Sequence, residues 1–277
     1  MGLRTNALAV ARDERLPTVS LLGARITALD EHQIVAFFCE EIAAGRGGWV
    51  FTMNLDHLRR FVKGPVREQC HRLATIITPD GMPLLWASRL QGTPVPDRVS
   101  GADLILSMTA AAARRDYSIF LIGGDGGAAE ATAATLRQMH PGLRIAGINS
   151  AWFEADGSSP AMDALVDELR RTRPDLVFVG IGSPKSERIT ERLRASVGAV
   201  MPSTWWIGVG ISFSFISGQI PRAPHWMQRS GLEWVHRLWQ EPRRLAKRYL
   251  VEGLPFALTL FARSWLRRWR PAAPHEE

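Results

Sequence analysis

The stretch from residue 118 to residue 139, SIFLIGGDGGAAEATAATLRQM, decides the fold of this chain of 277 residues. An apolar run over residues 118–124 has the length of a strand and leads into a glycine-rich turn. An Ala-rich segment over 127–139 follows, with Leu136 and Met139 at helical spacing. A strand, a tight turn and a helix in this order predict a parallel sheet.

The same alternation extends in both directions from this stretch. Near-continuous apolar strands are typical of a sheet that is buried on both faces. The sequence therefore predicts an α/β fold, a single Rossmann-like parallel-type sheet flanked by helices. The other expected strands cover residues 48–54, 75–80, 143–149, 175–182 and 205–210, and the other expected helices cover residues 101–115 and 160–172.

The composition changes near Gly218, where the strand pattern stops. Residues 219–277 contain 11 Arg or Lys against 5 Glu, so they carry +6 of the net charge of +7, and they hold five of the ten Trp. We expect an N-terminal extension over 1–18, an α/β domain over 19–218, and a basic, Trp-rich helical appendage over 219–277. A local basic patch indicates an anionic partner, such as phospholipid, nucleic acid or a phosphorylated substrate.

Cysteine usage and hydropathy bear on the compartment. Cys39 and Cys70 are the only cysteines and lie outside any CxxC motif, so a reducing cytoplasm is expected. Residues 1–17 lack the apolar core of a signal peptide. The most apolar stretch, 249–262, contains Glu252 and Pro255 and is shorter than the roughly 20 residues that a membrane span needs.

Five expected strands end in polar or glycine-rich turns. Ligands of open α/β sheets bind beyond the carboxyl ends of the strands, so these turns are expected to form one site. Each turn alone is also explained as a tight connection between a strand and a helix. The turns are residues 52–54, 79–81, 123–127, 182–185 and 208–210.

Asp80 follows one of these strands and precedes Gly81. A carboxylate in this place can accept a proton from a hydroxyl nucleophile. The sequence Pro-Asp-Gly is equally typical of a turn in which Asp caps the backbone. Spacing alone leaves both interpretations open. The neighbouring pair Asp56 and His57 is expected to lie on the solvated surface, because adjacent side chains usually point apart.

Two turns suggest phosphate binding. Gly124, Gly126 and Ala129 match the dinucleotide fingerprint, which suits an NAD-type oxidoreductase or the diphosphate of a nucleotide sugar. In the turn GSPKSE, Ser183 is predicted to cap a helix that begins at Pro184. Lys185 would lie in the first turn, where the helix dipole disfavours a cation unless a phosphate lies nearby. The alternative is a solvated lysine.

The sequence contains no metal-binding pattern of the HExxH, paired His/Cys or Asp-x-Asp type. We therefore expect no metal and no cofactor, and we expect basic side chains and backbone amides to hold a diphosphate. No nucleic-acid-binding motif accompanies the charge of the appendage, so no nucleic-acid partner is expected.

Taken in order, these motifs resemble the WecG/TagA/CpsF family of bacterial glycosyltransferases from about residue 19 to about residue 250. The motifs are TMN (52–54), TPDG (78–81), DRVSGADL (97–104), FLIGGDGGAAE (120–130), PGLRIAG (141–147), PDLVFVGIGSPKSE (174–187), IGVGISFSFISG (207–218) and the segment 222–249. The family usually has Gln where this chain has Ser186, and Asp where it has Ser214.

The resemblance implies an inverting, metal-independent transfer of a hexose from a UDP-sugar to a polyprenyl-diphosphate-linked acceptor, in bacterial surface polysaccharide synthesis. It implies that Asp80 is the catalytic base and that Thr52, Asn54 and Arg98 support it in the pocket. In agreement with the residue patterns, Arg98, Lys185 and arginines of the appendage are expected to neutralise the departing UDP. A nucleotide-binding membrane adaptor without turnover is a further hypothesis, and a homo-oligomer is left open. The candidate substrate-binding residues are Thr52, Asn54, Gly81, Arg98, Gly123, Gly124, Gly182, Ser183, Lys185, Glu187, Gly208, Gly210 and Arg222.

The appendage has the pattern of an interfacial amphipathic helix. Phe261, Trp265 and Trp269 recur every four residues, with arginines on another face, and residues 232–249 repeat the pattern. The protein is therefore expected at the cytoplasmic face of the inner membrane, bound peripherally to anionic lipid. A helix packed on its own core with solvated arginines is the alternative. The candidate membrane-docking residues are Arg237, Arg244, Arg248, Arg263, Trp265, Arg267 and Trp269.

Overall fold

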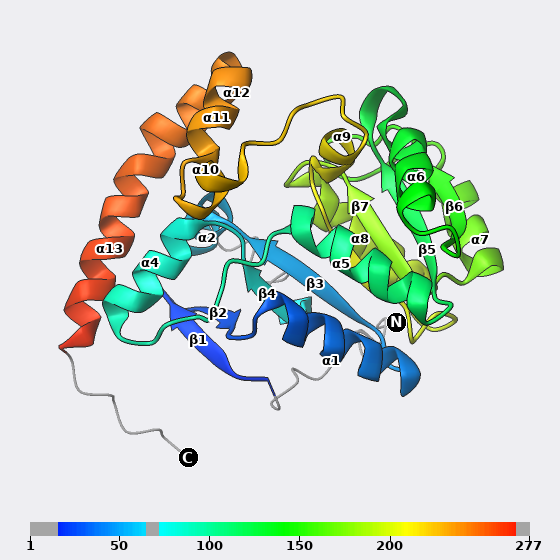
Figure 1. Ribbon diagram of the computed structural model, residues 1–277, viewed down its shortest axis with the longest axis horizontal. Coiled ribbons are helices and arrows are strands. Elements are labelled where there is room, and N and C mark those ends of the chain that lie inside the picture. The colour runs from blue at the N-terminus through cyan, green and yellow to red at the C-terminus, as the bar shows by residue number, and fades with distance from the viewer. Residues whose placement is uncertain (1–15, 65–71, 270–277) are drawn as a thin grey trace, which may run out of the picture.

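A six-stranded parallel sheet forms the centre of the computed structural model, which describes residues 16–64 and 72–269 (Figure 1). The strand order is β4-β3-β8-β7-β5-β6, and every neighbouring pair is parallel. The strands are β3 (Gly48–Met53), β4 (Ile76–Pro79), β5 (Ser118–Gly123), β6 (Arg144–Asn149), β7 (Leu176–Gly180) and β8 (Trp205–Gly208). The predicted α/β fold is confirmed.

Helices cover both faces of the sheet because both faces are apolar. In β7, Leu176 and Phe178 belong to one buried cluster, and Val177 and Val179 belong to the other. The first cluster includes residues of α1, α5 and α6, and the second includes residues of α7 and α8. The bounds are α1 (Glu31–Ala43), α5 (Gly101–Arg114), α6 (Ala128–Met139), α7 (Met162–Thr172) and α8 (Lys185–Val197), and the short turn η2 (Asp125–Gly127) precedes α6.

An antiparallel hairpin, β1 (Thr18–Leu21) and β2 (Ala24–Thr27), lies beside the sheet and was not predicted. Its two turn residues, Leu22 and Gly23, both have positive φ angles, as a tight hairpin turn requires. The hydroxyl of Thr27 accepts a hydrogen bond of 3.1 Å from the backbone N–H of Ile77, which belongs to β4. The predicted extension over 1–18 lies almost wholly outside the described residues.

The C-terminal region is helical, as predicted. After α9 (Ser212–Ile216) come α10 (His225–Arg229), α11 (Glu233–Gln240), α12 (Pro242–Ala246), the π-helical η3 (Lys247–Gly253) and α13 (Leu254–Arg268). Helix α13 lies alongside α4 (Met82–Gln91), and Phe256 and Leu260 of α13 share a buried cluster with Leu84 and Leu85 of α4 (Figure 1). Among the described residues, no helix is both long enough and apolar enough to cross a bilayer.

Candidate functional site

A cavity of about 1480 Å³ opens at the carboxyl ends of the strands. Its walls include the five turns that the sequence singled out, which follow β3, β4, β5, β7 and β8, so the predicted convergence is confirmed. The C-terminal region supplies a further part of the wall, including residues of α11 and η3. Residues of α4 and of the segment 150–153 also line the pocket. The strand-end turns and the C-terminal helices thus contribute to one and the same pocket.

Asp80 lies in the pocket directly after β4, where its backbone N–H donates to the carbonyl of Met53 at 2.8 Å. Within the described residues its carboxylate receives no hydrogen bond, and α4 begins after Gly81 without a side-chain cap. The turn-cap interpretation is therefore wrong. Desolvation by the surrounding protein raises the pKa of Asp80 to about 7, although Arg98 opposes this shift. Asp80 can therefore bind or release a proton near neutral pH.

Arg98 and Arg222 approach this carboxylate from two segments, but both are held by Asp103. The carboxylate of Asp103 accepts hydrogen bonds from Arg98 Nη2 at 2.9 Å and from Arg222 Nη1 at 2.7 Å. The hydroxyl of Ser100, the N-cap of α5, donates to it at 2.7 Å. The sequence analysis did not select Asp103, although its place three residues after a capping Ser was a signal.

Thr52 and Asn54, at the end of β3, both line the pocket. The hydroxyl of Thr52 donates to the carbonyl of Gly208 at 3.4 Å and so ties β3 to β8. The side-chain oxygen of Asn54 caps α2 (Leu55–Lys63) by accepting from the N–H of His57. Its amide nitrogen remains as the donor for a ligand.

The predicted glycines serve two purposes. A Cβ atom on Gly123 would lie 2.4 Å from Ile181, and one on Gly124 would lie 2.8 Å from the nitrogen of Ala129, so close packing accounts for these two glycines. In contrast, Gly126 has a positive φ and open space where a side chain would lie. The same open space surrounds the Cα atoms of Gly182, Gly208 and Gly210. A ligand can approach the backbone closely at these turns.

The turn 182–187 differs from its prediction at the helix start. Helix α8 begins at Lys185 with Pro184 as N-cap, and Ser183 makes no cap because its hydroxyl donates to Glu187 and accepts from Arg60 instead. Lys185 is not a freely solvated side chain. Its Nζ donates to the carbonyl of Phe153 at 3.0 Å and lies 4.2 Å from the ring centre of Trp152.

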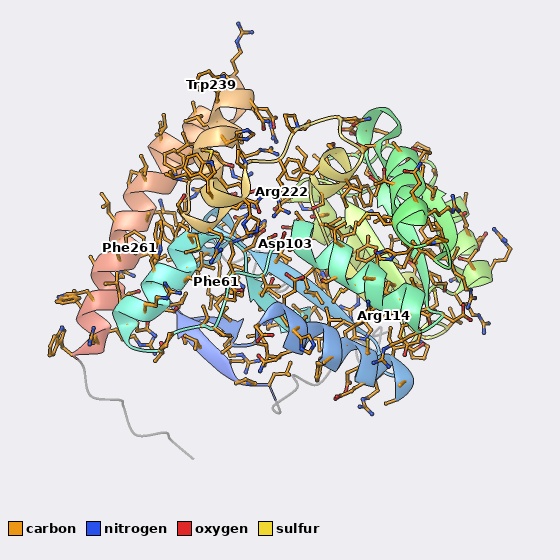
Figure 2. All side chains as sticks on the ribbon, in the orientation of Figure 1. Phe61, Asp103, Arg114, Arg222, Trp239 and Phe261 are labelled. Carbon is orange, nitrogen blue, oxygen red and sulfur yellow. The ribbon has the colours of Figure 1, made fainter. Side chains whose placement is uncertain are left out.

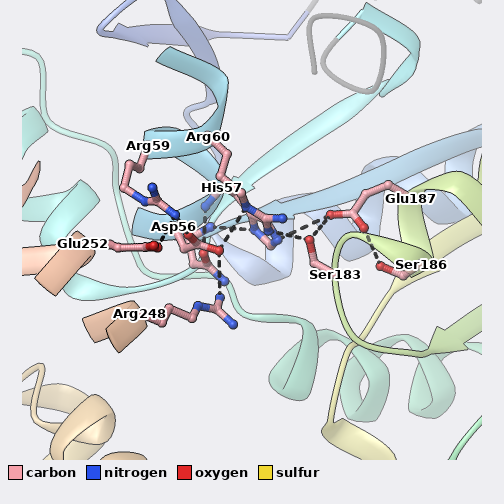
Figure 3. Close-up of polar contacts among 10 residues, drawn as sticks. Asp56, His57, Arg59, Arg60, Ser183, Ser186, Glu187, Arg248 and Glu252 are labelled. Carbon is pink, nitrogen blue, oxygen red and sulfur yellow. Dashed lines mark hydrogen bonds and ion pairs between the residues drawn. The ribbon is translucent and has the colours of Figure 1, made fainter. Parts of the chain in front are cut away.

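Asp56 and His57 do not lie on the solvated surface, which corrects the prediction (Figure 3). His57 Nδ1 accepts from the N–H of Asn54, and Nε2 lies 3.4 Å from Glu187. Burial lowers the pKa of His57 to about 4, so the imidazole is neutral at pH 7 and carries its proton on Nε2. This histidine lines the pocket and joins α2 to α8.

Asp56 is the centre of an ion cluster that joins α2 to the C-terminal region (Figure 3). It pairs with Arg60 at 3.0 Å and with Arg248 of η3 at 3.4 Å. Arg59 bridges Asp56 and Glu252 at 2.8 and 2.6 Å. Sequence reasoning missed this cluster because its residues in α2 and its residues in η3 are nearly 200 positions apart in the chain.

The assignment of Arg237 and Arg248 to an outer docking surface is corrected, because both line the pocket. Arg237 is only 8% exposed, pairs with Glu241 at 2.7 Å and lies over the ring of Phe215. Arg244 also pairs with Glu241, although more than half of its side chain is exposed. Arg237 of α11 and Arg248 of η3 therefore turn toward the pocket.

The predicted membrane-docking residues of α13, and Trp269 directly after it, lie on the outside. Arg263, Trp265, Arg267 and Trp269 are all exposed, whereas Phe261 packs against Trp86 of α4 with ring centres 6.4 Å apart. Figure 2 shows Phe261 between α13 and α4, and Trp239 at the far end of α11.

No group of three or more His, Cys, Asp or Glu side chains suited to a metal ion occurs within residues 16–64 and 72–269. The pocket offers cationic and backbone N–H groups instead, and such groups bind anions.

Comparison with known proteins assigns this arrangement to a family. The family model described as "Glycosyl transferase WecG/TagA/CpsF family" matches residues 19–271. Two similar curated proteins carry the name N-acetylglucosaminyldiphosphoundecaprenol N-acetyl-beta-D-mannosaminyltransferase. The one from Bacillus spizizenii is 29% identical over 199 residues, which are 72% of this chain and 74% of the relative. The one from Bacillus subtilis is 30% identical over 171 residues, which are 62% of this chain and 63% of the relative. The chain belongs to the WecG/TagA/CpsF family of glycosyl transferases.

Proposed function

We propose that this glycosyltransferase moves a hexose-type sugar from a UDP-sugar to a sugar carried on a polyprenyl diphosphate, with inversion and without a metal ion. The single observation that carries the chemistry is Asp80, a carboxylate in the pocket with a pKa of about 7 and no hydrogen-bond partner among the described residues. A group with such a pKa is suited to general base catalysis at neutral pH.

In the proposed step, Asp80 takes the proton of the acceptor hydroxyl while the hydroxyl oxygen bonds to the anomeric carbon of the donor. The bond from that carbon to the diphosphate oxygen breaks, and its electron pair leaves with UDP. The diphosphate carries two negative charges in the donor and gains a third as the bond breaks, so the leaving group needs charge compensation. Arg98, Lys185 and the inward arginines of the C-terminal region are the cations that line the pocket.

The size of the pocket supports two substrates. A volume of about 1480 Å³ exceeds the roughly 300–1,000 Å³ that is typical of sites for one small ligand. The open glycine turns at Gly126 and Gly182 leave room for the donor diphosphate against backbone N–H groups. The acceptor then enters beside Asp80, between the sheet and the C-terminal helices.

The acceptor proposal draws on the relatives and on the C-terminal surface. The names of the two Bacillus relatives specify an N-acetylglucosaminyldiphosphoundecaprenol acceptor. Of the 16 exposed large apolar side chains in the described part of this chain, 11 belong to residues 219–269, which fits contact with lipid. We propose that these helices dock on the cytoplasmic face of the inner membrane, where the enzyme contributes to a cell-envelope polysaccharide.

The test is Asp80→Asn, assayed as UDP release with N-acetylglucosaminyldiphosphoundecaprenol and a panel of UDP-sugars. Loss of the base should lower kcat by about 10²–10⁴-fold and leave the Kd for UDP nearly unchanged. Asp116→Asn is the matched control, because Asp116 is exposed and outside the pocket. Near-normal turnover by Asp80→Asn would refute the catalytic role.

A further inference from the structure

Asp103 is the most heavily hydrogen-bonded carboxylate beside the proposed base. Its two oxygens accept from Ser100, Arg98 and Arg222, at distances of 2.7, 2.9 and 2.7 Å. Figure 2 labels Asp103 and Arg222 together at the centre of the molecule, between α5 and the C-terminal helices. Burial disfavours the charge on Asp103, but these hydrogen bonds outweigh it and lower its pKa. Asp103 is therefore ionised when Asp80 titrates.

Asp80 has the opposite environment. It shares both arginines as electrostatic neighbours, yet neither arginine donates a hydrogen bond to it. Arg98 Nη1 is buried and has no hydrogen-bond partner in the part of the chain that the structure describes, so it can still donate a hydrogen bond. The charged and titratable groups that act on Asp80 are Arg98 from the segment before α5, Asp103 from α5, Arg222 from the segment after α9, Glu233 from α11 and Tyr249 from η3.

We propose that Asp103 is a positioning residue for the transfer reaction: its carboxylate holds Arg98 and Arg222 next to Asp80 and prevents either arginine from pairing with that base. The inference rests on the proposed function, since it assigns Asp103 a role in setting up the catalytic base. An arginine that pairs directly with a carboxylate lowers its pKa by about 1–3 units, which weakens it as a base. Held by Asp103, both cations remain available to the phosphates of the substrates.

The position of Asp103 explains why one carboxylate can hold both arginines. Asp103 lies in the first turn of α5, where the N–H groups of the helix end favour a negative charge. Arg222 reaches it from a segment 119 residues later in the chain, at the start of the C-terminal region. The contact therefore also fixes the wall of the pocket that the C-terminal helices form.

The experiment is Asp103→Asn, which keeps the shape of the side chain and removes its charge. The first readout is the pKa of Asp80, measured from its side-chain carboxyl ¹³C resonance, which Asp80→Asn identifies. Loss of a neighbouring negative charge and release of Arg98 both favour ionised Asp80, so its pKa should fall by about 1 unit or more. The second readout is the pH profile of transfer, whose acid limb should move down equally while kcat on the plateau falls roughly tenfold.

Three variants make the result interpretable. Asp103→Glu restores the charge and should return the pKa of Asp80 toward its wild-type value. Asp163→Asn is the matched control, since Asp163 lies in the first turn of α7, exposed and outside the pocket. Asp103→Ser, which keeps a residue suited to a helix start, carries the same expectations as Asp103→Asn if the latter does not fold.

An unchanged or higher pKa of Asp80 in the folded variant would overturn the proposal, and so would a raised KM with an unmoved acid limb. If the pKa of Asp80 falls as expected but the wild-type chain transfers no sugar from any UDP-sugar, the contact stands and the proposed function fails. The NMR titration thus separates the two failures, because it needs no substrate.

Discussion

The sheet domain and the C-terminal helices use amphipathic sequence in opposite ways. In the sheet domain, apolar strand residues are buried under helices, and the polar turns open into the pocket. In the C-terminal region, α13 turns Phe256 and Leu260 inward but leaves Leu258 and Trp265 exposed. In the neighbouring helix α11, the charged Arg237 points inward and is 8% exposed, whereas the apolar Trp239 points outward and is 87% exposed.

This difference shows that the two regions have different surroundings to satisfy. A sheet that binds a polar ligand needs its polar groups at the strand ends, which water or ligand can reach. The C-terminal helices carry apolar side chains as well as Arg263 and Arg267 on their exposed face, and Arg237 and Arg248 on the pocket face. This arrangement fits the proposed phosphate-bearing pocket on one side and the proposed lipid surface on the other. The acceptor of the proposed reaction, a sugar diphosphate on a lipid, would present its phosphates to the pocket and its lipid chain to the apolar medium.

The junction between the regions offers the largest expected effect. Asp56→Ala should leave Arg60 and Arg248 without their carboxylate partner, in a cluster whose side chains are mostly buried. Removing one partner of a buried ion pair costs about 3 kcal/mol. The midpoint of urea unfolding should therefore fall, and trypsin should cleave the C-terminal region faster.

Asp167→Asn is the control for this change, because its pair with Arg170 is exposed and surface pairs contribute at most about 1 kcal/mol. If Asp56→Ala unfolds earlier but the C-terminal region resists trypsin as well as in the wild type, the cluster does not join the two regions.

The outer face of the C-terminal region gives the next effect. Trp239 and Trp269 are 87% and 70% exposed, and each Trp can bury about 150–250 Å² of surface in a lipid interface. Replacing both with Ser should weaken binding to vesicles that contain phosphatidylglycerol by about tenfold or more. Vesicle co-sedimentation measures this change.

Met139→Ser is the matched control, since Met139 is 52% exposed but belongs to α6, in the other region. Equal vesicle binding by the double Trp variant and the wild type would contradict the docking proposal. Binding that resists high salt would indicate that the apolar contacts, and not the arginines, supply most of the affinity.

The same contrast explains what the sequence could predict. The strands of the central sheet were predicted because each is a short apolar run with a turn signal at its end, and local pattern is sufficient for that. The hairpin β1–β2 was missed because Leu22, at a φ of 50°, is not a residue that such turns prefer. Periodicity found the amphipathic helices but did not show which of their faces the sheet domain covers.

The site was predicted where a strand end determines the position, as for Asp80 and Thr52. It was missed where two distant segments meet. His57 turns back to cap α2 and is then covered by Glu187 of α8, and Arg237 points at Phe215. The burial of His57 depends on a segment more than 100 positions away in the chain, and no local sequence pattern carries that information.

The last expected effect concerns the dependence of stability on pH at Asp80. Its pKa is raised from 3.8 to about 7 in the folded chain, so the ionised carboxylate is less favourable in the folded state than in the unfolded state. The stability that protonated Asp80 contributes is complete below about pH 4 and is lost as the pH rises through 7. Asp80→Asn cannot ionise, so at pH 8 its Tm should exceed that of the wild type by a few degrees.

The advantage should disappear at pH 4, where wild-type Asp80 is itself mostly neutral in the folded chain, and calorimetry at the two pH values measures the difference. A proposed base kept in a desolvated pocket thus reduces stability at neutral and alkaline pH, which is the expected cost of desolvating an ionisable carboxyl group. An Asp80→Asn variant with the same Tm as the wild type at both pH values would show that Asp80 is already solvated. The pocket would then have no means to raise the pKa of Asp80, and the comparison between a desolvated carboxylate in the sheet domain and an exposed apolar face on the C-terminal helices would no longer hold.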